Sequence, residues 1–237
     1  MSAEKGSQAI VADTDDLQIL YEPGTTDTAI VSFTGVGLEL GGVQEIEFSR
    51  SLRSRSESHH VYFVTDRGRS WFNKTKDKIV ESLAPLLLHH ASVVTLGNSM
   101  GGFGALYFSG LFPNCRRAIS FVPQFSVTLD SPEPRWMGWR SKIQPWIIQH
   151  ALENLTDDAP SIVLFGAGKA EDIWHIEQFR ARLGEPHALF VLPAGGHNVA
   201  KAIRRRGLLP RLIEDAACRV PASDLAQMLA AGGLKPK

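Results

Sequence analysis

A serine flanked by two glycines is the feature of this sequence with the clearest chemical potential. Gly97, Ser99 and Gly101 form a G-x-S-x-G pattern between a short apolar run, residues 92–96, and a helix-forming run of small residues. Glycines allow the sharp strand-to-helix turn that lifts a serine hydroxyl clear of the backbone. We therefore predict that Ser99 is a nucleophile. A glycine-rich turn that binds phosphate, or nothing, is the alternative, and no lysine accompanies the turn to favour it.

This strand–turn–helix segment resembles the nucleophile elbow of the α/β-hydrolase superfamily. The resemblance covers residues 17–215 as an order of elements, and it is sharpest at the elbow. In that family the nucleophile, the acid and the histidine follow one another along the chain in this order. The resemblance therefore implies that the partners of Ser99 lie in its C-terminal half.

The base implied by this order is His197, because a serine hydroxyl needs a general base at neutral pH. His197 lies on a glycine-containing loop just after the predicted strand 188–192, whereas the other histidines lie earlier in the chain. The implied acid is Asp172, with Glu171 as the second choice, after the predicted strand 161–165. Many relatives carry this acid nearer to the strand, where this chain has Lys169. The competing interpretation makes Asp172 a helix N-cap.

An oxyanion hole requires two backbone N–H donors. The N–H of Met100, directly after the nucleophile, is one candidate. The other candidate is the N–H of Val36, in the loop after the predicted strand 28–33. The family usually has His-Gly-x in this loop, and Thr34 replaces the histidine here. A plain glycine turn is the alternative interpretation of this segment.

The elements around these residues predict an α/β protein. Continuously apolar strands separated by helices indicate a mostly parallel central sheet with helices on both faces, here the α/β-hydrolase fold. Ligands bind such sheets at the carboxyl ends of the strands. We expect strands at residues 17–21, 28–33, 60–65, 92–96, 117–122, 161–165 and 188–192.

The connections carry further expectations. The first two strands should form a hairpin or lie as neighbours, a helix should cover residues 46–55, and the chain after Pro221 should be a looser tail. Residues 1–237 should form a single domain with a small lid insertion at about 123–158. The insertion contains three tryptophans that either line an apolar pocket or pack on the core: Trp136, Trp139 and Trp146.

Basic residues lie in three places near the predicted site. Residues 65–70 resemble a D-x-R-G stretch of the family, in which Arg67 or Arg69 either meets an anionic substrate or, more simply, anchors a loop. Arg135, Arg140 and Lys142 give the insertion a basic character that suits an anionic or glycan-linked substrate. The run at residues 204–206, three arginines, is interpreted as a solvated helix face.

Bulk composition excludes several classes of partner. Lys plus Arg and Asp plus Glu both number 25, so a zero net charge gives no reason to expect nucleic-acid binding. Two cysteines without a CxxC pair cannot form a disulfide framework. The polar N-terminus and the absence of an apolar run of about 18 residues indicate no signal peptide and no membrane association, hence a cytoplasmic protein. No metal or organic cofactor is implied, and the oligomeric state is not fixed by the sequence.

These expectations combine into a serine hydrolase that cleaves a carboxylic ester or thioester through an acyl-serine intermediate. Its substrate would be a small-molecule or glycan-linked acyl compound. Two alternatives stay open. The same acyl-serine can pass its acyl group to an alcohol, which makes the protein an acyltransferase, or the chain can be a non-catalytic member of the fold that binds a ligand.

Overall fold

The computed structural model describes residues 8–37, 44, 46–53 and 58–237 and contains an eight-stranded sheet. The spatial order of the strands is β1-β2-β4-β3-β5-β6-β7-β8. Strand β2 is antiparallel to its two neighbours, β1 and β4, and all other pairs are parallel. The strands are β1 Ala9–Asp13, β2 Leu17–Glu22, β3 Thr28–Phe33, β4 His60–Asp66, β5 Ser92–Asn98, β6 Cys115–Phe121, β7 Ser161–Gly166 and β8 Ala188–Leu192.

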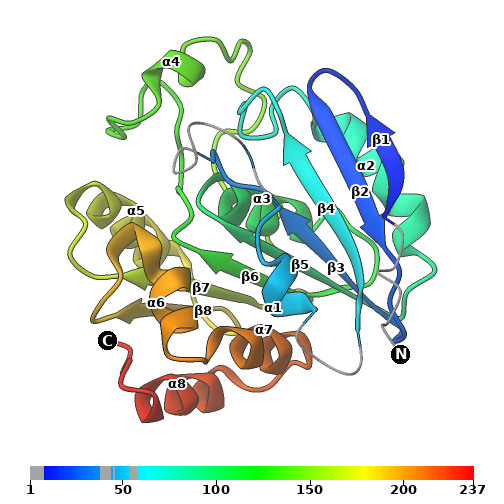
Figure 1. Ribbon diagram of the computed structural model, residues 1–237. Helices are drawn as coiled ribbons and strands as arrows, with labels where there is room; N and C mark the ends of the chain where they lie inside the picture. Colours follow the sequence, from blue (N-terminus) through cyan, green and yellow to red (C-terminus); the bar gives the residue numbers. More distant parts are fainter. Residues whose placement is uncertain (1–7, 38–43, 45, 54–57) are drawn as a thin grey trace.

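Helices cover both faces of this sheet (Figure 1). Helices α2 and α3 lie behind the sheet in the view of Figure 1, whereas α1, α6 and α7 lie in front of it. This arrangement confirms the predicted mostly parallel sheet with helices on both faces. The helices are α1 Ser49–Leu52, α2 Lys76–Leu87, α3 Met100–Ser109, α4 Met137–Arg140, α5 Ala170–Arg182, the 3-10 turn η2 Gly196–Asn198, α6 Val199–Arg205, α7 Leu209–Ala217 and α8 Ala222–Ala231.

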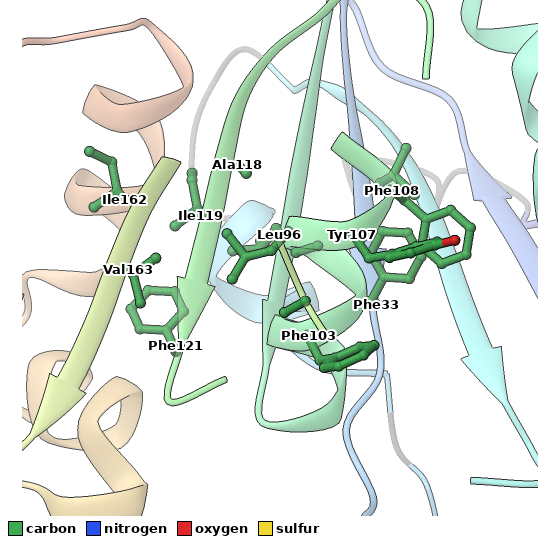
Figure 2. Close-up of a cluster of buried hydrophobic side chains, with 14 of the residues drawn as sticks. Phe33, Leu96, Phe103, Tyr107, Phe108, Ala118, Ile119, Phe121, Ile162 and Val163 are labelled. Atoms are coloured by element: carbon green, nitrogen blue, oxygen red, sulfur yellow. The ribbon is translucent and has the colours of Figure 1, made fainter. Parts of the chain in front are cut away.

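The core concentrates around α3, every residue of which is buried. Figure 2 shows Phe103, Tyr107 and Phe108 from this helix beside Phe33 of β3 and Leu96 of β5. The rings of Phe33 and Phe108 stack with centroids 5.1 Å apart. Full burial of one such phenylalanine side chain contributes about 1.5–3 kcal/mol. Because α3 packs tightly against the central strands, it holds the turn between β5 and α3 in place.

Small residues allow this close contact between helix and sheet. A Cβ atom on Gly97 would lie 2.1 Å from the carbonyl oxygen of Gly101, and one on Gly101 would lie 2.0 Å from the carbonyl oxygen of Phe33. Neither separation is possible between real atoms, so both positions require glycine. The two glycines of the serine motif therefore serve the approach of α3 to β3 and β5.

Strands β2 and β3 are not neighbours, so the prediction that they form a hairpin or lie side by side is wrong. Strand β4 lies between them, antiparallel to β2 and parallel to β3. The reason is burial: β4 is buried along most of its length and needs a partner on each side, whereas only half of the residues of β2 are buried. In addition, an N-terminal strand that the sequence did not predict, β1, extends the edge of the sheet.

Two helical predictions also needed correction. Helix α1 spans only Ser49–Leu52, although part of the predicted helix 46–55 lies outside the described residues. The expected loose tail after Pro221 instead contains α8, which buries Leu225 and Leu229 and follows the proline, a residue that favours helix starts. None of the described helices is long and apolar enough to cross a bilayer.

The insertion at residues 123–158 connects β6 to β7 and has one short helix, α4. Its loops converge on Arg140, whose side chain is almost completely buried. Arg140 donates hydrogen bonds to the carbonyl oxygens of Val127, Thr128 and Glu133. A buried guanidinium has five donors, and here they bind loop carbonyls that would otherwise lack partners. Arg140 thus links several loops of the insertion to one another.

Candidate active site

Ser99 lies at the turn between β5 and α3, as the motif predicted. Its backbone has φ 58° and ψ −121°, a conformation that non-glycine residues rarely adopt. Backbone strain of this kind persists only where the surroundings enforce it. Here the N–H of Ser99 donates to the carbonyl of Phe121 at 2.8 Å, and its carbonyl accepts from the N–H of Phe103 at 3.0 Å. The turn is therefore fixed from both sides.

The structure brings His197 and Asp172 to Ser99. His197 Nε2 lies 3.0 Å from Ser99 Oγ, and His197 Nδ1 lies 3.1 Å from Asp172 Oδ2. His197 comes from η2, just after β8, and Asp172 comes from the first turn of α5, after β7. Because Nδ1 faces a carboxylate, it carries the proton and donates, which leaves Nε2 to accept the serine hydroxyl proton. This is the order of groups that a general base requires.

Two alternative interpretations, Asp172 as a helix N-cap and Glu171 as the acid, do not fit the geometry. Helix α5 begins after its N-cap, Lys169, so Asp172 is not the cap. Glu171 pairs with Lys169 at 3.0 Å, and its carboxylate has no contact with His197 among the described residues. The Asp172 side chain is only 1% exposed, against 25% for that of His197. Asp172 is therefore the carboxylate that contacts the imidazole of His197.

Arg135, from the insertion, also binds the acid. Its Nη2 lies 2.9 Å from Asp172 Oδ1 and 2.7 Å from Glu133 Oε2. Burial alone would raise the pKa of Asp172, but the hydrogen bond from His197 and the charge of Arg135 lower it below its usual range. Sequence reasoning noted Arg135 only as part of a basic stretch, because its contact with α5 depends on how the insertion folds.

A buried histidine, His175, lies close to Arg135 and shares Glu133 with it. Its Nδ1 accepts a hydrogen bond from the N–H of Phe125 at 3.0 Å, so Nε2 carries the proton and donates to Glu133 Oε2 at 2.7 Å. Burial lowers the pKa of His175, consistent with a neutral ring. Burial opposes the charge of Glu133, yet hydrogen bonds from Arg135 and His175 lower its pKa to about 2. Asp172 is therefore linked through Arg135 to the buried side chains of Glu133 and His175.

Gln124 is a contact of the nucleophile that sequence reasoning missed. Its Nε2 donates to Ser99 Oγ at 3.0 Å, and its Oε1 accepts from Trp71 Nε1 at 3.0 Å. The side chains of Gln124 and Trp71 are fully buried. Since Ser99 Oγ accepts from Gln124, its own proton is directed to His197. Gln124 follows the carboxyl end of β6, where ligand-facing residues gather in such sheets, so its position was the available signal.

The two proposed oxyanion donors occupy the expected elements. Met100 is the first residue of α3, and Val36 follows β3 at the edge of a pocket that also contains Ser99. Thr34, which stands in place of the family's histidine, contacts β4, because its Oγ1 lies 3.1 Å from Thr65 Oγ1. Arg69 holds the loop by donating to the carbonyl of Val36 at 2.8 Å.

Arg69 and Arg67 both contact groups within the chain. The Arg69 guanidinium also lies over the Trp139 ring, 5.1 Å from its centroid, and Arg67 pairs with Asp13 at 2.7 Å. Of the three tryptophans in the insertion, Trp136 is the one that lines the pocket among the described residues, and Arg135 lies over its ring at 4.4 Å. The insertion therefore contributes one aromatic wall, not three.

The pocket beside Ser99 has a volume of about 650 Å³. Its apolar walls come from Val36, Ile46, Phe48, Trp136, Ala200 and Leu209. Arg204, which the sequence placed on a solvated helix face, lines it as well. Among the described residues, no group of three histidine, cysteine, aspartate or glutamate side chains is arranged to hold a metal ion. The pocket can therefore accommodate an apolar part of a ligand next to Ser99.

Comparison with known proteins supports the fold through structure. No protein-family model matches the sequence, and no curated protein resembles it closely enough to count as a relative. A sugar hydrolase from Lactococcus lactis superposes with a TM-score of 0.63 at 17% identity, covering 95% of this chain and 96% of that one. The capsule O-acetyltransferase of Neisseria meningitidis serogroup A gives 0.62 at 15% identity, covering 85% and 92%.

A third similar structure is the α/β-hydrolase domain-containing protein 10 from mouse, with a TM-score of 0.53 at 15% identity over 88% of this chain and 97% of that one. At such identities the likeness concerns the path of the backbone. Strand order, elbow geometry and these superpositions agree, and the chain therefore has the fold of the α/β-hydrolase superfamily.

Proposed function

We propose that this protein is a serine hydrolase that cleaves a carboxylic ester or thioester through an acyl intermediate on Ser99. The observation that carries the proposal is the relay Asp172–His197–Ser99, with successive contacts of 3.1 Å and 3.0 Å. A relay with these distances activates a hydroxyl that is otherwise a weak nucleophile. The strained turn, which presents Ser99 at the edge of the pocket, supports the same proposal.

The reaction follows from the positions of these groups. Ser99 Oγ attacks the carbonyl carbon while His197 Nε2 takes the hydroxyl proton, and the N–H groups of Val36 and Met100 bind the oxyanion. The tetrahedral intermediate then expels the alcohol or thiol, which receives that proton from His197. Water next attacks the acyl-serine with His197 again as the base, releasing the carboxylic acid and free Ser99.

Acyl transfer is the second candidate, because the structural neighbours include an O-acetyltransferase as well as hydrolases. The first half of the reaction is the same. The second half differs only in that an acceptor alcohol replaces water as the attacking group. Product analysis with an added acceptor alcohol separates the two reactions.

A fluorophosphonate probe, which reacts with activated serines, tests the proposal directly. We expect the wild-type protein to be labelled, and the label to be lost in Ser99→Ala and strongly reduced in His197→Ala. Circular dichroism of both variants serves as the folding control. A folded wild-type protein that is not labelled would contradict the proposal and favour a ligand-binding protein without catalysis.

A further inference from the structure

The pocket beside Ser99 carries positive charge on its open side. Arg50 of α1 and both Lys201 and Arg204 of α6 line it, and all three residues are exposed. Among the residues that the structure describes, neither Arg50 nor Arg204 forms an ion pair. The whole chain has a net charge of zero, so this concentration of cations beside the serine is a local feature.

The described pocket wall holds a single acidic residue, Glu47, and this residue does little to offset the cations. Its Oε2 is enclosed and has no hydrogen-bond partner among the described residues. Burial raises the pKa of Glu47 to about 8, against the lowering effect of a hydrogen bond from the backbone of Gly35. At neutral pH the carboxyl group is therefore mostly protonated and adds little negative charge to the described pocket wall.

The spacing of the cations indicates which part of a substrate they would meet. Lys201 and Arg204 are three residues apart on α6, a spacing that places side chains on one face of a helix, and His197 lies in η2 directly before this helix. His197 delivers its proton to the leaving oxygen or sulfur, so the leaving portion of the substrate must lie on the His197 side. The face of α6 that lines the pocket therefore extends from the leaving atom toward solvent.

We propose that Arg50, Lys201 and Arg204 bind an anionic group, a phosphate or a carboxylate, on the alcohol or thiol portion of the acyl substrate. This inference rests on the function proposed above and specifies its substrate class. The apolar wall near Trp136 and Leu209 receives uncharged parts of the same molecule. The anionic group takes no part in bond changes: the ester bond breaks, the leaving atom gains the proton from His197, and the anion stays on the released alcohol or thiol.

Three acetyl esters of para-substituted phenols, which carry two, one or no negative charges, test this inference on the complete protein. The probes are the dianionic 4-acetoxyphenyl phosphate and the neutral methyl 4-acetoxybenzoate, with 4-acetoxybenzoate as the carboxylate arm. We expect kcat/KM to favour the phosphate ester by about tenfold or more at low salt, and the preference to shrink as salt screens the charges. The ester 4-acetoxybenzoate, which carries one negative charge, shows whether a single charge is sufficient for this preference. Equal kcat/KM for charged and neutral esters would overturn the inference.

Variants of the rim identify the residues responsible. In Arg50→Gln and Arg204→Gln we expect the preference for the phosphate ester over the neutral ester to fall about fivefold each, as for the loss of one partly exposed ion pair. Arg205→Gln is the matched control, because Arg205 is exposed on the same helix but does not line the pocket. A loss of preference in Arg205→Gln equal to that in Arg204→Gln would contradict a specific site.

A binding measurement separates failure of this inference from failure of the catalytic proposal. Phenyl phosphate is titrated calorimetrically into Ser99→Ala, which needs no reactive serine, and into Ser99→Ala combined with Arg204→Gln. Binding that weakens about fivefold in the double variant supports the anion site even if the protein proves unable to turn over esters. Absence of phenyl phosphate binding to Ser99→Ala would overturn the inference while leaving acyl-serine chemistry intact.

Discussion

At the scale of single residues, the hydroxyl of Ser99 is held by two partners rather than one. Gln124 donates to its oxygen at 3.0 Å, while His197 Nε2 lies 3.0 Å away to accept its proton. A hydroxyl that is fixed in this way spends little time in unproductive rotamers. Gln124 is thus a positioning residue that acts through the nucleophile, and Trp71 in turn fixes Gln124.

Removal of this donor should slow acylation without weakening substrate binding. We expect Gln124→Ala to lower kcat and the rate of fluorophosphonate labelling by about tenfold, with little change in KM, because the lost interaction orients the nucleophile rather than the substrate. Gln149→Ala, on an exposed glutamine of the same insertion, is the control. A Gln124→Ala variant that is labelled at the wild-type rate would rule out this role.

Glu47 makes the stability of the fold depend on pH. Its pKa is raised by burial to about 8, so the folded protein holds this proton more tightly than the unfolded chain. Stability therefore falls as pH rises from the ordinary pKa of the carboxyl group toward about 8. His197, Arg50, Lys201 and Arg204 are the other charged or titratable residues of the described pocket wall.

Glu47→Gln should remove this dependence. We expect the variant to be more stable than the wild type at pH 9, by about 1–2 kcal/mol, and nearly equal to it at pH 4. Urea unfolding at the two pH values gives the difference, with Glu81→Gln on the exposed face of α2 as the control. If the difference in unfolding free energy between wild type and Glu47→Gln were the same at both pH values, burial would not raise the pKa of Glu47.

At the scale of elements, the insertion between β6 and β7 contributes to the site through Arg135. This side chain bridges Asp172 and Glu133, two buried carboxylates from different segments. Loss of the bridge leaves both carboxylates without their cation. Removing one partner of a buried ion pair commonly costs about 3–5 kcal/mol.

Arg135→Gln should therefore destabilise the fold and change the pH profile. The pKa of Asp172 is depressed in the folded state, so the stability it contributes is present at neutral pH and is lost as pH falls through that pKa. Without Arg135 this pKa rises, and we expect the acid limb of kcat/KM to move to higher pH. Lys142→Gln, at an exposed position of the same insertion, should leave the profile unchanged.

The elbow is a second element whose packing can be tested. A Cβ on Gly101 would lie 2.0 Å from the carbonyl oxygen of Phe33, so Gly101→Ala must push α3 away from β3. We expect a loss of about 3 kcal/mol or more in the free energy of unfolding and a large loss of labelling. Gly138→Ala, where the added atom would meet nothing within 4 Å, should cost almost nothing. Similar stabilities for the two variants would refute this view of the elbow.

At the scale of the whole molecule, the parts that the sequence predicted well are those governed by local pattern. Continuous apolar runs predicted the central strands, and β3 and β8 have the predicted bounds. The turn at Ser99 follows from its glycines. The order of elements along a shared fold also led to His197 and Asp172, because chain order survives even where identity to solved structures falls to 15–17%.

The remaining features depend on contacts between distant segments. The separation of β2 from β3 follows from the pairing of β4 with both strands, which no local pattern records. Arg135 and Gln124 act on the site only because the insertion folds back over α5 and the elbow. The charge around the pocket likewise requires α1 and α6 to face one cavity.

The most direct test of the central claim is to trap the intermediate. The protein is mixed with an activated acetyl ester, quenched in acid within the burst phase, digested and mapped by mass spectrometry. We expect one acetyl group on the peptide that contains Ser99, and its absence from Ser99→Ala. Turnover of the ester with no acetyl group on Ser99, or with the acetyl group on another residue, would contradict the account.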